Sequence, residues 1–303
     1  MASSLKAWIS ASRPRTLPLS VSGILVGSAY AIYQGVFETP IFIFALITTI
    51  LFQILSNFAN DYGDGIKGTD NDERLGPMRA LQSGQISAQA FKNGLILTSI
   101  LSLSSAIILI YLAFGQENLI MSLVFLVLGI IAIIAAIKYT VGDSAYGYRG
   151  FGDVFVFIFF GLVSVCGSYV LYAKTLDWIL ILPGASIGFL SSAVLNLNNM
   201  RDLNSDKAVQ KNTLAVKLGL QNAKIYHFSL IILGLVSFVL FLSLEKLSIY
   251  SFISLISFVI LFLHLKFVKK NQYPKAFDPE LKKVALSTFA IALIFFVVQI
   301  LVI

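Results

Sequence analysis

Nine long apolar runs constrain the fold of this chain more than any other feature. A helix needs roughly 20 predominantly apolar residues to cross the hydrocarbon core of a membrane. Inside that core every backbone polar group must be paired within the helix itself. The sequence therefore predicts an all-α integral membrane protein with nine transmembrane helices. Their expected ranges are 17–35, 41–58, 95–115, 119–138, 153–173, 178–198, 225–244, 247–266 and 283–303.

The composition supports a membrane protein and argues against a disulfide-stabilised protein and a nucleic-acid-binding protein. Hydrophobic residues make up 57% of the chain and charged residues only 12%, whereas soluble domains carry about 25% charged residues. One cysteine, Cys166, lies in an apolar run, so it forms no disulfide framework within the chain and is expected to pack as a small apolar residue. The net charge of +7 is typical of nucleic-acid binding, but the basic residues cluster between membrane runs. We therefore expect no nucleic-acid partner.

The basic residues indicate the orientation, because cytoplasmic loops of membrane proteins carry an excess of Lys and Arg. With the N-terminus in the cytoplasm, of the 22 Lys and Arg residues only Lys174 and Lys246 fall in outer loops. We therefore expect a multi-pass protein of the cell inner (plasma) membrane, with the C-terminus outside. The outer loops of this topology are 36–40, 116–118, 174–177 and 245–246.

Two polar stretches, 57–64 and 196–206, each begin where an apolar run ends. Asp61 and Asp64 are three residues apart, and Asp202 and Asp206 are four apart, so each pair lies on one helical face. Such paired carboxylates suit Mg²⁺, which takes one or two carboxylates together with phosphate oxygens. The two pairs predict a site for magnesium and a phosphorylated substrate on the cytoplasmic side.

The same two stretches indicate an internal repeat. They sit four predicted helices apart, so residues 17–138 and 153–266 are expected to be two parallel four-helix units, followed by a final helix at 283–303. All 303 residues then form a single membrane domain.

A single acidic cluster at a membrane surface is usually only a solvated face, but two features argue for a site. Amide side chains such as Asn57 and Asn198 lie on the apolar side of the acidic pairs, where an unpaired amide costs free energy. Cations also alternate with the acids, as at Lys67, Arg79 and Lys211. Cations and carboxylates together are what a metal ion and a diphosphate require.

Four segments, in this order along the chain, resemble one known family. They are 12–18, 53–64, 139–153 and 198–206, which contain SRPRTLP, QILSNFANDYGD, YTVGDSAYGYRGFGD and NNMRDLNSD. The pattern resembles the UbiA superfamily of intramembrane prenyltransferases, and within it the enzymes that prenylate 1,4-dihydroxy-2-naphthoate. The resemblance extends from the N-terminal segment through the seventh predicted helix.

The resemblance implies nine helices around a central cavity open to lipid, a polyprenyl diphosphate donor and Mg²⁺ as cofactor. It implies catalytic and metal-binding roles for Asp61, Asp64, Asp202 and Asp206, with Asn57 as a further metal ligand. One departure concerns the first motif. Many relatives carry another Asp four residues after the position of Asp64, where this chain has Gly68, and its next acid is Asp70.

The resemblance and the charges of the side chains also suggest which residues bind the two substrates. Residues expected to bind diphosphate are Lys67, Lys138, Arg79, Arg201 and Lys211. Residues expected to bind the acceptor are Arg13, Tyr139, Arg149 and Asn198. Lys138 and Arg149 suit either substrate. Each of these residues has an alternative role. Arg13 and Arg149 are also explained as cations that set the membrane topology, and Tyr139 as an aromatic residue of the membrane interface.

The function implied is transfer of a polyprenyl group to 1,4-dihydroxy-2-naphthoate with loss of CO₂, in menaquinone biosynthesis. Alternatives within the family are a 4-hydroxybenzoate or homogentisate acceptor, or a phytyl donor. A secondary transporter is the alternative of another class, but transporters place polar residues near mid-membrane, whereas here they gather at one face. His227 and His264 lie inside apolar runs and are expected to be hydrogen-bonded structural residues.

Overall fold

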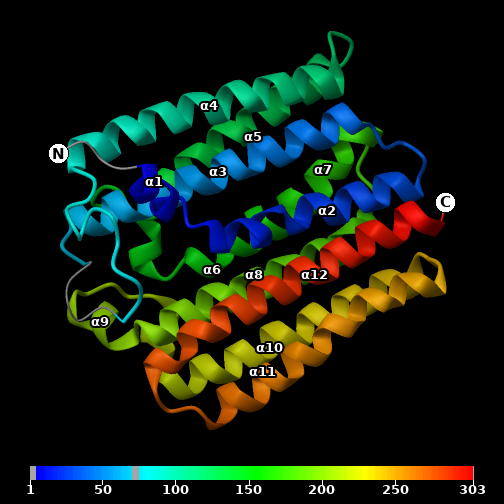
Figure 1. Ribbon diagram of the computed structural model, residues 1–303. Helices are drawn as coiled ribbons and strands as arrows, with labels where there is room; N and C mark the ends of the chain where they lie inside the picture. Colours follow the sequence, from blue (N-terminus) through cyan, green and yellow to red (C-terminus); the bar gives the residue numbers. More distant parts are fainter. Residues whose placement is uncertain (1–4, 70–74, 303) are drawn as a thin grey trace.

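Long helices, lying side by side, make up nearly all of the described structure (Figure 1). The computed structural model describes residues 5–69 and 75–302, and in these ranges it contains helices, turns and no strand. The α-helices are α1 (Leu5–Ala11), α2 (Leu17–Tyr33), α3 (Thr39–Ile66), α4 (Ala88–Phe114), α5 (Leu119–Lys138), α6 (Gly152–Val156), α7 (Ser164–Ala173), α8 (Ile181–Arg201), α9 (Leu203–Ala208), α10 (Leu214–Leu244), α11 (Phe258–Lys270) and α12 (Asp278–Val302). The 3₁₀-helical segments are η1 (Pro14–Thr16), η2 (Tyr146–Arg149), η4 (Trp178–Leu180), η5 (Ile249–Ser257) and η6 (Pro274–Phe277), and η3 (Phe157–Val163) is a π-helical segment.

The prediction of nine membrane helices is confirmed for the described residues, where nine helical stretches are long and apolar enough to cross a membrane. Helices α3 and α10 extend furthest beyond their predicted ends. Helix α3 continues from the predicted residue 58 to Ile66, so that the first Asp pair lies on the helix itself. Helix α10 begins at Leu214, where the Thr213 hydroxyl caps it by accepting from the Val216 N–H at 3.4 Å. Its backbone breaks once, at Gly219, whose φ of 72° requires the freedom of glycine.

Helices pack in the same order in the two halves of the chain. Helix α3 packs against α2 and α4, and α8 packs against the α6–α7 span and α10. The final helix, α12, lies along α2 and also contacts α8 and η5, so it joins the two halves (Figure 1). This arrangement is compatible with a duplicated four-helix unit, which stays a prediction.

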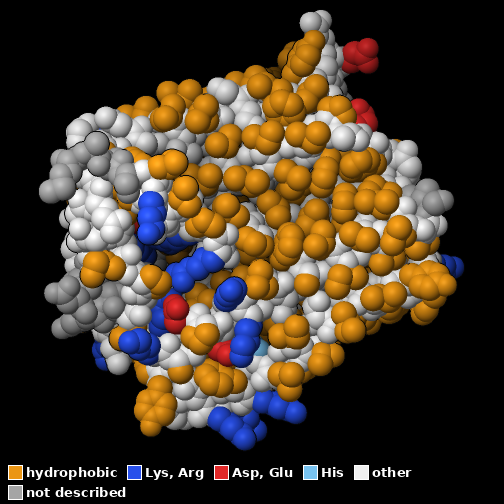
Figure 2. Space-filling model, viewed as in Figure 1, with side chains coloured by type: hydrophobic (Ala, Val, Ile, Leu, Met, Phe, Trp, Pro, Cys, Tyr) orange, Lys and Arg blue, Asp and Glu red, His pale blue; other side chains and the backbone are white. Residues whose placement is uncertain are grey.

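Apolar side chains cover the outside of the bundle. In Figure 2 hydrophobic residues occupy most of the visible face, while Lys and Arg gather around a hollow at the end where α3 and α8 finish. The exposed hydrophobic side chains come from nearly every span, and include Ile100, Ile120 and Leu233. Soluble monomers rarely expose contiguous apolar patches of more than a few hundred Å². The surface is thus suited to hydrocarbon, as expected of a membrane protein.

Two buried histidines link three helices. His227 of α10 and His264 of α11 face each other with their Nε2 atoms 2.8 Å apart, and His264 Nδ1 lies 2.5 Å from the Glu280 carboxylate of α12. The expectation that both histidines are hydrogen-bonded inside the bundle is confirmed.

Small residues allow the fifth and sixth spans to cross closely. The fifth span contains a π-helical turn, η3, and Gly161 within it faces the backbone of α8. A Cβ placed on Gly161 would lie 2.4 Å from the Gly184 carbonyl oxygen and 2.6 Å from Gly188 Cα. Small residues at such crossings let membrane helices pack backbone to backbone. This contact sets the position of η3, which lines the cavity described below.

We expect Gly161→Ala to destabilise the protein, because its methyl group must push the two spans apart. Overpacking of this kind costs about 1–3 kcal/mol, which a lower thermal unfolding temperature in detergent will report. Gly129→Ala is the matched control, since a Cβ there meets only Ala106, at 3.9 Å. Equal unfolding temperatures for the two variants would contradict the proposed role of Gly161.

Candidate active site

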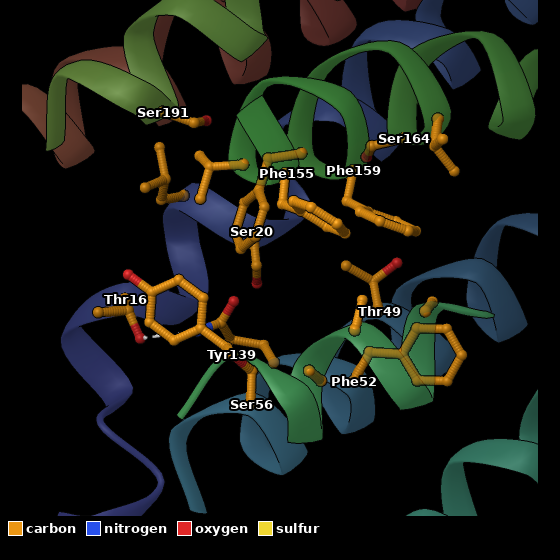
Figure 3. Close-up of a pocket in the computed structure, with 18 of the residues that line it drawn as sticks. Thr16, Ser20, Thr49, Phe52, Ser56, Tyr139, Phe155, Phe159, Ser164 and Ser191 are labelled. Atoms are coloured by element: carbon orange, nitrogen blue, oxygen red, sulfur yellow. Dashed lines mark hydrogen bonds between the residues drawn. The ribbon is translucent and has the colours of Figure 1, made fainter. Parts of the chain in front are cut away.

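A cavity of about 390 Å³ lies within the bundle. Its charged lining residues lie at the end where α3 and α8 finish, and its lining extends to Ala45 and Leu171 toward the opposite end. Its walls come mainly from α2, α3, α5, η3, α7 and α8. Figure 3 shows Phe155 and Phe159 projecting into it from one side, with Thr49 and Phe52 on the opposite wall. Charged and amide side chains line the mouth, and apolar side chains line most of the remainder. The predicted central cavity is therefore present, and its size is typical of small-molecule sites.

The first Asp pair lies on the last turns of α3 and is buried. Asp61 and Asp64 are each 2% exposed, so each carboxylate needs a nearby cation. Asp61 forms an ion pair with Arg13, and its Oδ1 lies 3.5 Å from Arg79 Nε. Arg79 also donates to Asp64 at 2.8 Å and to the Asn60 carbonyl at 2.9 Å. Arg79 thus holds both carboxylates of the pair.

Asp64 has two further partners, which come from distant parts of the chain. Lys211 Nζ lies 3.3 Å from Asp64 Oδ2, and the Tyr148 hydroxyl donates to Asp64 Oδ1 at 2.7 Å. Lys211 follows α9 and Tyr148 belongs to η2. Asp64 is therefore the point where the first motif, the second motif and the connection between the halves meet.

Asn57 fastens the N-terminal segment to α3. Its amide group donates to the Ser12 carbonyl at 2.8 Å and to the Thr16 hydroxyl at 3.3 Å, and its own oxygen accepts from Gln53 at 3.1 Å. Arg13 lies between these anchors with φ of 50°, a left-handed conformation that is uncommon for a residue with a Cβ. The anchors direct Arg13 to Asp61 at the mouth of the cavity.

The second Asp pair is organised around Arg201. This guanidinium, only 1% exposed, donates to both carboxylate oxygens of Asp202, at 2.9 and 2.6 Å. It also donates to Asn198 Oδ1 at 2.8 Å and to Asp278 Oδ1, on the first turn of α12, at 2.5 Å. Asp206 follows on α9, where its backbone N–H donates to the Asp202 carbonyl at 2.8 Å.

The two Asp pairs do not by themselves form a complete metal cage. Among the residues that the structure describes, no three His, Cys, Asp or Glu side chains are grouped closely enough to hold a metal ion. Each pair still offers two neighbouring carboxylates. Mg²⁺ is commonly bound in this way, by one or two carboxylates with the remaining oxygens supplied by substrate phosphates and water.

Tyr139 is held at the cavity wall by two glycines. A Cβ at Gly147 or at Gly152 would lie 3.1 Å from its ring carbons, so larger residues would displace the ring. Burial, together with the nearby Asp153 carboxylate, raises the pKa of the Tyr139 phenol above its ordinary value. Tyr139 therefore keeps its proton at neutral pH and is available as a hydrogen-bond donor. Figure 3 shows its side chain among those that line the cavity.

The predicted site residues differ in how they lie relative to the cavity. Seven line the cavity: Arg13, Asn57, Asp64, Arg79, Tyr139, Asn198 and Lys211. Asp61 lies directly behind Arg13 and Arg79. Six are placed away from the wall of this cavity: Lys67, Lys138, Arg149, Arg201, Asp202 and Asp206. Lys138 and Arg149 are exposed, whereas Arg201 is buried with its bonds directed to protein partners. Asp70 lies outside the described residues.

Two residues of the site were missed from the sequence. Tyr148 was noticed only as part of a motif, although it bonds to Asp64, and Asp278 was assigned no role, although it bonds to Arg201. These bonds join residues 84 and 77 positions apart. Sequence spacing carries no signal for such long-range contacts.

Comparisons with known proteins identify the family and the fold. The chain matches the UbiA prenyltransferase family over residues 20–279. It is 45% identical to 1,4-dihydroxy-2-naphthoate octaprenyltransferase of Escherichia coli K12, over 92% of this chain and 90% of the relative. It is 42% identical to the protein of the same name from Haemophilus influenzae, over 96% and 94%. A UbiA homolog from Archaeoglobus fulgidus, solved with DMAPP and Mg²⁺, shares the fold with a TM-score of 0.66 at 15% identity, over 96% of this chain and 99% of that one.

We expect Asp278→Ala to lower the thermal unfolding temperature in detergent, because it leaves buried Arg201 with one carboxylate instead of two. A hydrogen bond to a charged group contributes about 1.5–3 kcal/mol. The low end applies here, since the Asp278 side chain is 34% exposed and partly screened by water. The control is Glu117→Ala, which removes an exposed acid at the opposite end of the bundle. An unfolding temperature equal to the control would show that Asp278 does not hold Arg201.

Proposed function

The chain belongs to the UbiA prenyltransferase family, and we propose that it transfers a polyprenyl group from its diphosphate to 1,4-dihydroxy-2-naphthoate. The single observation that carries this proposal is the cavity, with buried Asp and Arg side chains at its mouth and an apolar interior. A substrate with a charged diphosphate and a long apolar tail matches both parts. The acceptor follows from the relatives named above, which are octaprenyltransferases acting on this naphthoate.

The residues present fit a magnesium ion, because the buried carboxylates of Asp61 and Asp64 both contact Arg79 at the cavity, and Asp64 itself lines it. We expect Asn57, Asp61, Asp64, Asp202 and Asp206 to hold Mg²⁺ together with oxygens of the donor diphosphate. Bound magnesium supplies Lewis acidity toward the departing diphosphate.

The cations of the mouth stabilise the leaving group. Arg79 and Lys211 line the cavity beside Asp64, so their charge lies where negative charge develops as the allylic C–O bond breaks. The electron pair of that bond stays on the diphosphate oxygen. Preorganised charge of this kind stabilises a transition state without reorganisation at the moment of reaction. Lys67 extends the same positive region.

The allylic carbon is then attacked by the electron-rich naphthoate ring. As the new C–C bond forms, the carboxylate leaves as CO₂, and its bonding electrons restore the aromatic ring. We expect Arg13, which lines the cavity, to pair with the acceptor carboxylate before it leaves, and Tyr139 and Asn198 to form hydrogen bonds with the ring hydroxyls. The apolar walls, including Phe155 and Phe159, exclude water that would quench the cation.

The reaction is proposed to take place at the cytoplasmic side of the inner membrane. The basic residues gather at the mouth end of the bundle (Figure 2), which the positive-inside rule assigns to the cytoplasm. A soluble acceptor and the charged diphosphate then meet the site from the water, and the tail enters from the surrounding lipid.

The test is an assay of membranes with 1,4-dihydroxy-2-naphthoate, a set of prenyl diphosphates and Mg²⁺. We expect release of diphosphate and CO₂ with formation of a prenylated naphthoquinol, and loss of turnover when EDTA removes the metal. Asp61→Asn and Asp202→Asn should each lower turnover by about 100-fold or more, the cost of removing one preorganised electrostatic group.

Glu117→Gln serves as the control, since this exposed acid lies in the turn before α5, away from the cavity. Its turnover should equal that of the unaltered protein. Turnover with 4-hydroxybenzoate or homogentisate instead of the naphthoate would overturn the proposed acceptor but keep the reaction. Folded protein that turns over no acceptor would overturn the reaction itself.

A further inference from the structure

Tyr148 occupies an unusual place in the site, between the two Asp motifs. It lies on η2, the short turn that follows α5, and its side chain extends to the end of α3. Its hydroxyl donates to Asp64 Oδ1 at 2.7 Å and lies 2.9 Å from the Thr69 hydroxyl. The phenol is thus fixed at its tip by the first motif.

The ring of Tyr148 has a cation from each motif over it. Lys67 Nζ lies 4.1 Å from the ring centroid, and Lys211 Nζ lies 5.1 Å from it. Lys67 caps the end of α3, whereas Lys211 belongs to the segment that follows α9. Ammonium groups within about 6 Å of an aromatic centroid are attracted by its negative faces. One aromatic ring therefore attracts both ammonium groups.

An aromatic partner differs from a carboxylate in a way that matters here. A carboxylate attracts a lysine but also neutralises its charge. The ring quadrupole attracts the ammonium groups without cancelling their charge, and Tyr148 places them together although like charges repel. Lys211 also pairs with Asp64, at 3.3 Å. The pair keeps positive charge for an anion that arrives beside Asp64.

The backbone fixes the ring relative to the second motif as well. The Asn212 N–H donates to the Tyr148 carbonyl at 3.1 Å, and Lys217 Nζ donates to the Arg149 carbonyl at 2.6 Å. Gly150 turns the chain directly afterwards with φ of 81°, and a Cβ there would lie 3.1 Å from the Asn212 carbonyl oxygen. Tyr148 is consequently held from both sides of the site.

We propose that Tyr148 is a positioning residue that holds Lys67 and Lys211 together as the binding site for the donor diphosphate. The inference rests on the proposed function and adds a specific element to it, a diphosphate cradle organised by an aromatic ring. In this proposal the Tyr148 side chain has two distinct roles. The hydroxyl orients Asp64, and the ring assembles the lysine pair.

The two roles predict different kinetics for two variants. Tyr148→Leu removes ring and hydroxyl, and we expect the KM for the prenyl diphosphate and the inhibition constant of inorganic pyrophosphate each to rise about tenfold. The KM for the acceptor should stay within about twofold. Tyr148→Phe keeps the ring, so pyrophosphate inhibition should stay within about twofold, while kcat falls about tenfold through the lost bond to Asp64. Tyr111→Leu, at an exposed tyrosine on α4, is the control.

A double-mutant cycle with Lys67→Gln tests the contact itself. If the ring holds Lys67, Tyr148→Leu combined with Lys67→Gln should weaken pyrophosphate inhibition by much less than the product of the two single effects. Protection of each variant from thermal unfolding by pyrophosphate and Mg²⁺ gives the same information without turnover. This protection can still be measured if Tyr148→Leu lowers the stability of the protein, because each variant is compared with itself without pyrophosphate.

Three outcomes would overturn the inference. Unchanged pyrophosphate inhibition in Tyr148→Leu would exclude the cradle, equal rises in donor and acceptor KM would indicate a general structural role, and independent effects in the double-mutant cycle would exclude the contact. Each of these results requires an active unaltered protein. Absence of turnover in the unaltered protein would instead count against the proposed function, and the thermal-protection measurement would still decide whether Tyr148 assembles a pyrophosphate site.

Discussion

The pairing of buried charges is the constraint on which the rest of this structure depends. Carboxylates at the end of a membrane-embedded bundle are too costly to leave without cations. The structure meets this cost with partners from separate elements. Arg13 before α2 and Arg79 before α4 pair with Asp61 on α3, whereas Arg201 on α8 joins Asp202 to Asp278 on α12. The ion pairs that make the charges tolerable also fasten the helix ends around the cavity, so stability and site geometry have one origin.

Much of the architecture could be predicted from the sequence, because apolar length and motif order are local properties. The nine spans, the two polar stretches and the hydrogen-bonded state of His227 and His264 are confirmed by the structure. The end of α3 was predicted too early and the start of α10 too late, since polar residues were assumed to lie outside helices. In fact Asp61 and Asp64 remain helical, because partners brought from other elements pair with their side chains.

The site was less predictable, because its contacts join distant residues. The sequence shows that Arg201 is basic and so could bind a diphosphate. It does not show that Arg201 is buried and hydrogen-bonded to Asp278 instead of pointing into the cavity. Lys138 and Arg149 match a diphosphate by charge, yet both are exposed away from the cavity wall. The π-helical turn η3 and the ring stack of Tyr146 on Phe155, with centroids 4.0 Å apart, also depend on neighbours that only the folded chain provides.

The bond between Arg201 and Asp278 has a consequence for biosynthesis. Asp278 belongs to α12, which follows the other eight described spans along the chain and so enters the membrane after them. Until then a nascent chain already contains both Asp motifs, but Arg201 lacks its second carboxylate and α2 lacks the helix that lies along it. The arrangement around Asp202 is therefore complete only once α12 has been inserted. Insertion of α12 thus links the packing against α2 to the arrangement of the second Asp motif.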